Sequence, residues 1–370
     1  MLSHYFSLTG WAEGVRAAGA RVTVVQRFRQ DLTFKRESVD YTFVADGYGP
    51  ILRGWQFPLK MSRLIKQLTV ADRQAPGPTI IHLNGLLFPV QAFLLRLMLP
   101  QDMVIVAQHH AERPWPSPQR ICQRWGLKVV DGFLFTTRPL AREWIEAGVI
   151  RSSEKVYEVM ETSTPFQYQD RATARARTGL EGQPVILWTG SLTPNKDPLT
   201  VLAGVEKILD SLPDARLYMA YLHADLLPRV KAYIGRSLPL RRAVTLLGRI
   251  PHAEIETYYN SADIFVQGSH SESAGIALLD AMACGVVPVV TDIPSFRLMT
   301  ANGQIGELWP VGQSDALADA LLTVAGPGLP ELARASRHFF QENWRFSVIG
   351  RSALSVYNEI LAKKRHRQEH

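Results

Sequence analysis

The chain has few cysteines and no long hydrophobic run. Of its 370 residues only Cys122 and Cys284 are cysteines, and 162 positions separate them, which predicts no disulfide framework and is typical of a reducing cytoplasm. The longest apolar stretch, 86–100, contains Gln91 and Arg96 and is too short to span a bilayer. No signal-peptide pattern is apparent. These features favour a globular protein of the cytoplasm.

Several motifs of common cofactor sites are also absent. The sequence has no Asp-x-Asp triplet, and no Gly-x-Gly-x-x-Gly follows an expected strand, which disfavours a dinucleotide oxidoreductase. His109 and His110 are adjacent, lack a chelating spacing and have no cysteine cluster near them, which disfavours zinc. We therefore expect neither a metal nor a cofactor.

The positive charge is concentrated in the first half of the chain. Residues 1–165 carry 20 Lys and Arg against 14 Asp and Glu, whereas residues 166–370 carry 21 against 20. A basic surface attracts an anionic membrane, an acidic glycan or nucleic acid, and it also serves simply as a solvated face. No RNA-binding or helix-turn-helix pattern accompanies the charge, so we expect no nucleic acid. Peripheral association with the inner face of the membrane stays open.

The pattern of apolar segments indicates an α/β protein of two domains. A chain of this length exceeds what one hydrophobic core usually supports. Short β-rich segments alternate with helical or loop stretches, as in parallel sheets. The clearest strands are expected at 21–25, 79–84, 103–108, 132–136, 184–190, 263–268 and 286–291.

Two carboxyl residues flank a turn that opens a helix in the second half. The strand 263–268 precedes this turn, and the apolar run 276–283 is the helix. Gly275 lets the backbone approach a ligand closely, and the helix start offers free amides and a positive dipole end to a diphosphate. Glu272 lies in the turn and Asp280 in the helix. The alternative is an ordinary acidic helix start.

A second glycine turn follows the buried strand 184–190. Gly190 ends this strand, Ser191 follows it, and Lys196 lies in the loop before a helix that starts at Leu199. The carboxyl ends of strands are where open α/β sheets bind ligands. Lys196 can therefore place a positive charge on a phosphate there.

Residues 184–198 and 269–296 together resemble the donor-site signature of the family-four retaining glycosyltransferases. In that family a glutamate is followed by seven residues, a second glutamate and Ala-Met-Ala-x-Gly; Asp280 stands for the second glutamate. The family's Gly-Arg-Leu becomes Gly190-Ser191-Leu192, and Arg249 with Ile250 is the expected substitute on the nucleotide side. The resemblance implies a GT-B fold, in which two Rossmann-like parallel-sheet domains face each other across a cleft. It also implies that Ser273, Ala274, Gly275 and Ile276 bind the donor.

The same resemblance implies the domains and a candidate site in the first half. We expect residues 1–165, with the helix 346–370 packed back on them, to form the acceptor-side domain and 166–345 the donor domain. The family places a histidine after a strand near the transferred sugar, for which His110 is the choice and His109 the reserve. Gly10, Glu161 and Ser163 are further cleft candidates.

The first half begins with a helix pattern instead of a strand. Gly10 to Gly19 reads as a helix followed by a strand, whereas family members begin with a strand and a glycine-rich loop. We therefore expect the first, central strand of this domain to be missing.

The expected activity is retaining, metal-independent transfer of a sugar (EC 2.4, hexosyltransferase type) from a UDP- or GDP-linked nucleotide sugar to a glycan, lipid or small-molecule acceptor. Lys196, Glu272 and His110 are the expected catalytic residues, and Asp280 is expected to hold the ribose. A GT-B epimerase or phosphorylase and a catalytically impaired nucleotide-sugar binding protein remain alternatives.

Overall fold

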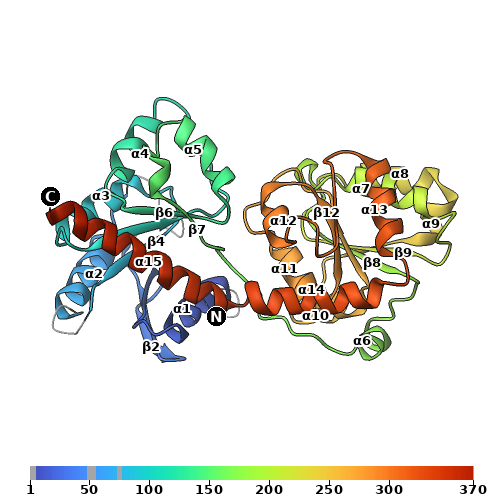
Figure 1. Cartoon of the computed structure of the whole chain (residues 1–370), viewed down its shortest axis with the longest axis horizontal. Helices are drawn as coiled ribbons and strands as arrows, with labels where there is room; N and C mark the ends of the chain where they lie inside the picture. The colour runs from blue at the N-terminus through green and yellow to red at the C-terminus, as the bar shows by residue number, and fades with distance from the viewer. Residues whose placement is uncertain (1–5, 48–55, 73–76, 370) are drawn as a thin grey trace. The chain divides into compact units, whose positions relative to one another are not determined.

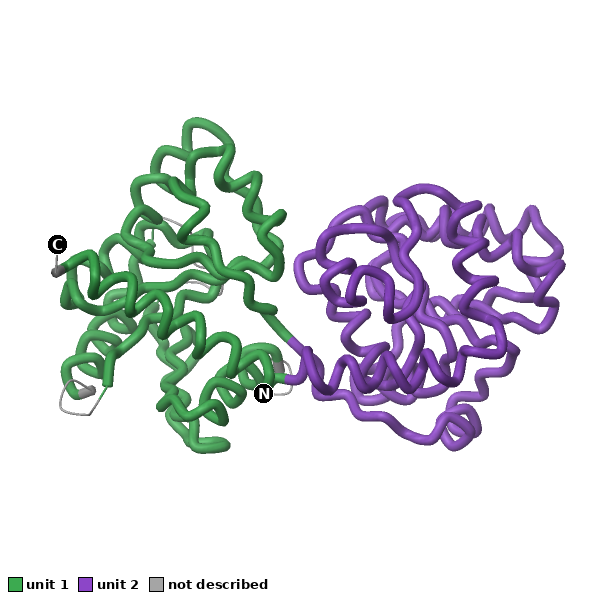
Figure 2. The backbone as a smooth tube through the Cα atoms, in the orientation of Figure 1, with its two compact units in different colours: residues 1–162, 346–370 green, residues 163–345 purple. Residues whose placement is uncertain are grey.

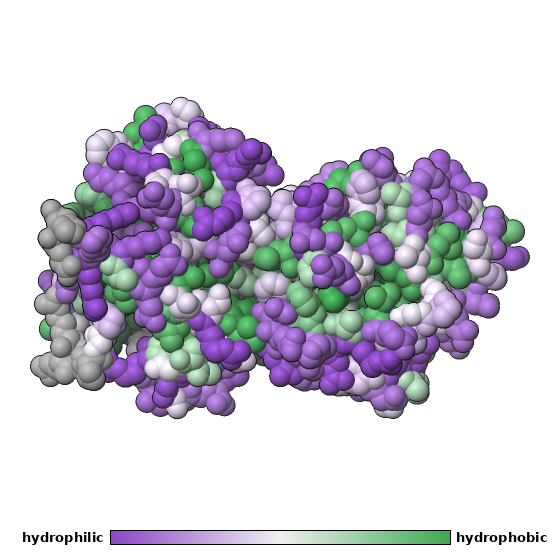
Figure 3. Space-filling view, viewed as in Figure 1, coloured by the Kyte–Doolittle hydropathy of each residue, from purple (hydrophilic) through white to green (hydrophobic). Residues whose placement is uncertain are grey.

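The computed structural model describes residues 6–47, 56–72 and 77–369. The chain forms two compact units, residues 1–162 with 346–370, and residues 163–345 (Figures 1 and 2). Their surfaces mix hydrophilic and hydrophobic residues (Figure 3). Among the described residues no helix is both long and apolar enough to cross a membrane.

The first unit contains two sheets. Strands β1 (Thr23–Arg27), β3 (Val39–Val44) and β2 (Leu32–Arg36) form one, in the order β1-β3-β2, with β1 parallel and β2 antiparallel to β3. Strands β4 (Ile80–Asn84), β5 (Val104–Gln108), β6 (Gly132–Phe135) and β7 (Val156–Glu158) form the other, all parallel and in chain order. The sequence did not predict the hairpin of β2 and β3. What precedes Phe6 lies outside the described residues, so a missing first strand stays a prediction.

The helices of the first unit lie between and beside these strands. They are α1 (Phe6–Ala17), α2 (Leu59–Asp72), α3 (Pro89–Met98), α4 (Arg120–Leu127), α5 (Arg142–Glu146) and the long α15 (Phe346–Glu369), with short 3-10 turns η2 (Arg138–Ala141) and η3 (Ser153–Lys155). Every residue of β5 and β6 is buried, as expected for parallel strands covered on both faces.

The second unit is one six-stranded parallel sheet. Its order is β10-β9-β8-β11-β12-β13, built from β8 (Val185–Gly190), β9 (Arg216–Tyr221), β10 (Val244–Gly248), β11 (Ile264–Gln267), β12 (Val287–Thr291) and β13 (Glu307–Trp309). In chain order this is 3-2-1-4-5-6, the order of dinucleotide-fold sheets. The α/β class and the two Rossmann-like units predicted from the sequence are therefore confirmed.

Two groups of helices accompany this sheet. Helix α7 (Pro198–Ile208) packs with α8 (Leu227–Arg236), α9 (Leu238–Ala243) and α13 (Ser314–Val324), while α11 (Ile276–Ala283) packs with α10 (His252–Ser261) and α14 (Leu329–Asn343). Helices α6 (Arg171–Thr178) and α12 (Pro294–Met299) and the turn η4 (Pro194–Lys196) complete the unit. Because the strand order runs outward in both directions from β8 and β11, right-handed crossovers put the two groups on opposite faces.

Helix α15 is held to the first unit by polar and close backbone contacts. Tyr357 of α15 hydrogen bonds to His82 Nδ1 at 2.5 Å, and burial lowers the pKa of His82 to about 3, so this histidine is neutral and structural. Lys364 reaches Asp131 at 2.9 Å. Near its start α15 crosses α1, where a Cβ atom at Gly350 would lie 2.1 Å from the carbonyl oxygen of Gly14. The two helix backbones therefore touch without side chains between them.

This close crossing predicts that Gly350→Ala destabilises the first unit. The added methyl group overlaps the backbone of α1, and overpacking of this kind costs roughly 1–3 kcal/mol. Gly235→Ala is the matched control, since this glycine lies in α8 with open space at its Cβ position. There alanine should be neutral or stabilising by about 0.5–1 kcal/mol through helix propensity. Thermal unfolding followed by circular dichroism compares the two; equal melting temperatures would contradict the predicted contact.

Candidate functional site

The strand order of the second unit reverses between β8 and β11. These two strands pair in parallel, Ile186 with Ile264 and Leu187 with Phe265. From β8 the chain builds the sheet toward β10, and from β11 it builds it the other way toward β13. Ligands of open α/β sheets bind outside the carboxyl ends of the strands at such a reversal. The loops that leave β8 and β11 are therefore the candidate site.

Hydrogen bonds join these two loops to each other. The N–H of His270 donates to the carbonyl of Asn195 at 2.8 Å, and the Asn195 amide donates to the carbonyl of Ser271 at 3.1 Å. His270 Nε2 lies 3.2 Å from the carboxylate of Asp197, which also caps the start of α7. The loop carrying Lys196 and the loop carrying Glu272 thus form one polar wall.

Lys196 and Glu272 meet in this wall. The ammonium group of Lys196 hydrogen bonds to Glu272 Oε1, and the side chains are only 21% and 15% exposed. Two side chains 76 positions apart are thereby brought together. A half-buried ion pair presents one cation and one anion side by side. It can exchange its internal contact for a ligand that carries a phosphate next to hydroxyl groups.

The start of α11 supplies an anion-binding backbone beside the pair. Gly275 is its N-cap in the left-handed conformation with φ of 53°, and a Cβ atom there would lie 2.7 Å from the Phe296 ring. Ser273 and Ala274 are buried in the approach to this turn, while Ile276 is 42% exposed. The first amides of a helix lack internal acceptors, and the positive dipole end favours an anion there.

Asp280 lies one turn into α11 and is half-buried. Burial is the main cause that raises its pKa to about 7; a hydrogen bond with Thr164 opposes this, and the charge of Glu256 adds to it. A carboxyl group with this pKa is poised between accepting and donating hydrogen bonds near neutral pH. It suits the hydroxyl pair of a ribose, the role that the resemblance implies.

The other predicted residues of this unit lie at the same edge of the sheet. Gly190 ends β8 and Ser191 follows it, half-buried, without a cation. Arg249 is exposed and Ile250 half-buried just after β10, which is separated from β8 by β9. Strand spacing puts β10 roughly 10 Å from β8, so Arg249 reaches the site only from its flank. Its substitution for the missing arginine stays a prediction.

A second polar group lies at the carboxyl edge of the first unit. His110 Nδ1 is 2.5 Å from Glu161 Oε2, and His110 Nε2 contacts Asn84 Oδ1. Burial acts to lower the pKa of His110, but the hydrogen bond and charge of Glu161, with the charge of Glu112, outweigh burial and raise it. Both ring nitrogens lie against oxygen atoms, which favours the protonated form of the ring in the same direction.

Glu112 and Asn84 were missed in the sequence. The Glu112 carboxylate accepts from the backbone N–H of Leu86 at 3.0 Å and of His110 at 2.5 Å, so it ties the loop after β4 to the loop after β5. Asn84 ends β4 and Glu112 follows β5, so both lie at the same edge as His110. The signal that could have found them is that polar residues at the carboxyl ends of neighbouring parallel strands lie close together.

Three of the expected site residues pack or hydrogen bond within their own units. His109 is buried, stacks on Phe135 with ring centroids 4.6 Å apart, and its Nε2 contacts the Glu112 carbonyl. Gly10 lies inside α1, as its helix pattern predicts, and packs against the Phe346 ring at the start of α15. Ser163 is fully buried and its hydroxyl donates to the Trp344 carbonyl. Gly10 and Ser163 thus make structural contacts within their own units, and their place in a cleft stays a prediction.

No group of three or more His, Cys, Asp or Glu within residues 6–47, 56–72 and 77–369 is arranged to hold a metal ion.

Comparison with known proteins gives the class and then the family. The chain is similar over 96% of its length to sucrose-phosphate synthase from Thermosynechococcus elongatus, with a TM-score of 0.69, 20% identity and 93% of that chain covered. It is also similar to Anabaena Alr3699/HepE in complex with UDP-glucose, with a TM-score of 0.61 and 16% identity over 80% of this chain and 82% of the other. The fold is therefore that of the GT-B glycosyltransferases.

Family models match both units. The model "Glycosyl transferases group 1" matches residues 170–325, and "Glycosyltransferase Family 4" matches residues 7–157. The chain belongs to the family-four glycosyltransferases. D-inositol 3-phosphate glycosyltransferase of Rhodococcus erythropolis is 28% identical over 196 residues, which are 50% of this chain and 44% of that protein. The chain spans about half the length of the curated relatives it matches.

The raised pKa of Asp280 predicts that Asp280→Asn stabilises the unliganded protein above pH 7. Below about pH 4 the carboxyl is neutral in the folded and unfolded states alike. Between its ordinary pKa of 3.8 and its folded pKa of about 7 the unfolded state ionises first, so stability falls as pH rises. The upper limit of this loss is about 4 kcal/mol. Asparagine removes the ionisation, and its advantage should grow from pH 5 to pH 8.

Asp292→Asn is the control for this titration. Arg297 lowers the pKa of Asp292, so that carboxyl is ionised in both states between pH 5 and pH 8 and its replacement should have an effect that does not vary with pH. Urea unfolding at both pH values gives the comparison. An Asp280→Asn effect as flat as that of Asp292→Asn would show that Asp280 is not desolvated.

Proposed function

We propose that the chain transfers a sugar from a nucleotide-sugar donor to an acceptor hydroxyl with retention of anomeric configuration and without a metal ion. The observation that carries this proposal is the contact of Lys196 with Glu272 at the strand-order reversal, beside the start of α11. A cation and helix amides suit a diphosphate, and a carboxylate suits sugar hydroxyls. Membership of the family and the UDP-glucose complex of a neighbour of the same fold support it.

In the proposed reaction the bond between the anomeric carbon and the diphosphate oxygen breaks. Lys196 leaves Glu272 for the diphosphate, and the amides of Ala274, Gly275 and Ile276 share the charge that develops on the leaving oxygen. Glu272, released from the lysine, orients the sugar, and Asp280 holds the ribose. Protein cations and a helix dipole take the place that a metal ion has in other transferases.

The acceptor hydroxyl attacks the anomeric carbon from the face that the diphosphate leaves. Its oxygen forms the new bond, and its proton passes to the departing phosphate oxygen. No second carboxylate stands out in the sequence as a nucleophile, which favours this route over a covalent sugar intermediate. His110, whose two ring nitrogens lie against Glu161 and Asn84, would contact the sugar only by giving up one of these internal partners. The donor is a UDP- or GDP-linked sugar, and the acceptor a glycan, lipid or small molecule.

Glu272→Ala should abolish most of the transfer while leaving the fold intact. Removing a group that orients the reacting sugar costs about 10²–10³-fold in rate, judged from comparable active-site deletions. Glu181→Ala, an exposed glutamate of the same unit, should keep full activity. A thermal-shift panel of UDP, GDP and their sugars first selects the donor, because a bound ligand raises the melting temperature. Product analysis with that donor then measures transfer.

The same assay separates the alternatives. Turnover of the nucleotide sugar without consumption of acceptor would identify an epimerase, for which the relatives named above give no support. Binding of nucleotide without turnover would identify an impaired binding protein. Unchanged transfer by the Glu272→Ala variant would refute the assigned role.

We also propose that the first unit docks on an anionic membrane surface at the inner face of the membrane through α3 and α4. Phe93 and Leu97 on α3, and Ile121 and Trp125 on α4, are 37–65% exposed. The two helices are neighbours, since a Cβ atom at Gly126 of α4 would lie 2.3 Å from the carbonyl of Pro89 at the start of α3.

Cations accompany these apolar side chains in the sequence on and around α4. Between Glu112 and Asp131 the chain carries Arg113, Arg120, Arg124 and Lys128 and no acid. The Lys128 ammonium lies 4.3 Å from the centroid of the Trp125 ring. Apolar side chains flanked by Lys and Arg, with a tryptophan, are the composition of helices that lie in the membrane interface.

The double substitution Ile121→Ser with Trp125→Ser should weaken vesicle binding without unfolding the protein, because both side chains are more than half exposed. Co-sedimentation with phosphatidylglycerol vesicles measures this, and about a tenfold loss is expected from the apolar area removed. Leu222→Ser, an equally exposed leucine of the other unit, is the control. Binding equal to that of the control variant, or binding to phosphatidylcholine just as strong, would contradict a docking surface here.

A further inference from the structure

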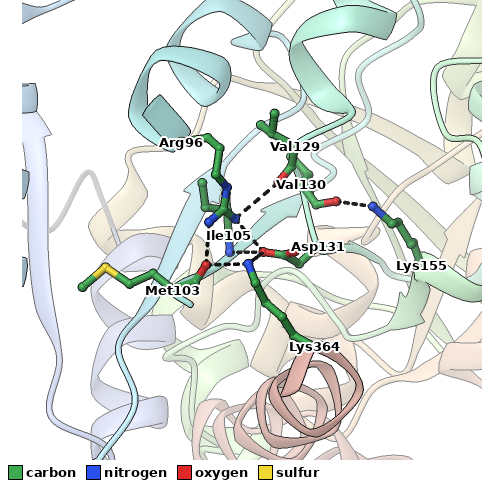
Figure 4. Close-up of polar contacts among 8 residues, drawn as sticks. All are labelled: Arg96, Met103, Ile105, Val129, Val130, Asp131, Lys155 and Lys364. Carbon is green, nitrogen blue, oxygen red and sulfur yellow. Dashed lines mark hydrogen bonds and ion pairs between the residues drawn. The ribbon is translucent and has the colours of Figure 1, made fainter. Parts of the chain in front are cut away.

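The amino edge of the four-stranded sheet carries a cationic cluster that the proposed transfer does not use. Met103, Asp131 and Lys155 immediately precede β5, β6 and β7, so they lie at the edge opposite to His110. Helix α15 brings Lys364 to this edge (Figure 4). The cluster lies wholly within the first unit.

At its centre one carboxylate serves two cations. Asp131 Oδ2 lies 2.7 Å from the Arg96 guanidinium and 2.9 Å from the Lys364 ammonium, and it also accepts the N–H of Ile105 at 2.8 Å (Figure 4). The Arg96 and Lys364 side chains are only 9% and 15% exposed. Weakly solvated cations need compensating charge. These two cations share one carboxylate contact, and the charge of Asp102 also acts on Lys364.

A small cavity of about 60 Å³ adjoins this centre. A single water needs roughly 10–15 Å³ by this measure, so an anion of the size of phosphate fits. Four cations line it against two acids. The lining residues are Asp131, Glu154, Lys155, Tyr157, Ile360, Lys363, Lys364 and Arg367.

The cations of the lining act on one another. Burial is the main cause that lowers the pKa of Lys155, and the charges of Arg367, Lys364 and Arg151 lower it further, against the opposing charge of Asp131. Burial likewise lowers the pKa of Lys364. Lys155 donates to the Val130 carbonyl at 2.7 Å, which fixes its ammonium beside the cavity. An anion in the cavity would relieve this repulsion.

We propose that this cavity binds a phosphate group between the amino edge of the sheet and the last turns of α15. The phosphate oxygens would accept from Lys155, Lys364 and the exposed Arg367, and the ligand would enter from the solvent side of Lys363. Charge-assisted hydrogen bonds to several cations are the usual recognition of phosphate. The site is separate from the donor site, which belongs to the other unit, so it does not rest on the proposed transfer.

Bound phosphate would strengthen the attachment of α15 to the sheet, because the ligand contacts both. Inorganic phosphate is the first probe, compared with chloride at equal ionic strength and pH 7.5. The full chain should show a phosphate-dependent rise in melting temperature that saturates, since a ligand of the native state stabilises by mass action.

Arg367→Gln tests the lining, with Arg365→Gln as the matched control. Both arginines are exposed near the end of α15, and only Arg367 lines the cavity. Arg367→Gln should weaken the apparent Kd for phosphate about threefold, as expected for one exposed cation, and the double variant with Lys155→Gln about tenfold. Arg365→Gln should leave the Kd unchanged. If both single substitutions weakened phosphate binding equally, the effect would be one of general charge, and the proposed site would be overturned.

Vesicles distinguish the source of the phosphate. Phosphatidic acid presents a phosphate monoester on a lipid, and phosphatidylglycerol a diester of lower charge. A preference for phosphatidic acid that Arg367→Gln removes and Arg365→Gln retains would assign the site to a lipid headgroup. Saturable stabilisation by inorganic phosphate without that preference would assign it to a free phosphate. The absence of both effects in the unsubstituted chain would refute the proposal.

Discussion

The parallel pairing of β8 with β11 is the constraint on which the candidate site depends. Because the sheet grows outward from this pair in both directions, no crossover helix covers the gap between the loops that leave the two strands. Lys196 and Glu272 meet in that gap although 76 residues separate them in sequence. A strand order without this reversal would put the two loops at different positions along the sheet, and their charges would not combine.

The ionic groups around Glu272 and around Asp131 differ in how their charges are balanced. Lys196 and Glu272 form a one-to-one pair, which can open for a ligand that offers charge of its own. Asp131 is shared between Arg96 and Lys364, so two cations have one carboxylate contact between them. The first arrangement suits a substrate that comes and goes. The second suits an anion that joins a returning helix to the sheet.

Much of the fold, and the residues of the loops that carry Lys196 and Glu272, could be predicted from the sequence, because they depend on nearby residues. The buried strands around Leu187 and Phe265 are apolar runs ended by glycine or polar turns, so their existence follows from hydrophobicity alone. The hairpin of β2 and β3 was missed: β2 is largely exposed and mixes charged with apolar residues, although β3 is mostly buried. The close contact of Gly10 could not be predicted, because the Phe346 ring that lies against it comes from the other end of the chain.

The α/β class, the helix start at Gly275 and the residue types of the loops after β8 and β11 follow from the sequence, because they depend on neighbours along the chain. The contacts of each side chain depend on the tertiary fold. It joined His110 to Glu161 and Asn84, buried His109 against Phe135, and desolvated Asp280 enough to raise its pKa to about 7. It also brought the Lys364 ammonium group into hydrogen-bond contact with Asp131, 233 positions away. Charge balance and burial depend on which distant residues come into contact. A local sequence pattern holds no information on these contacts, because they arise from packing.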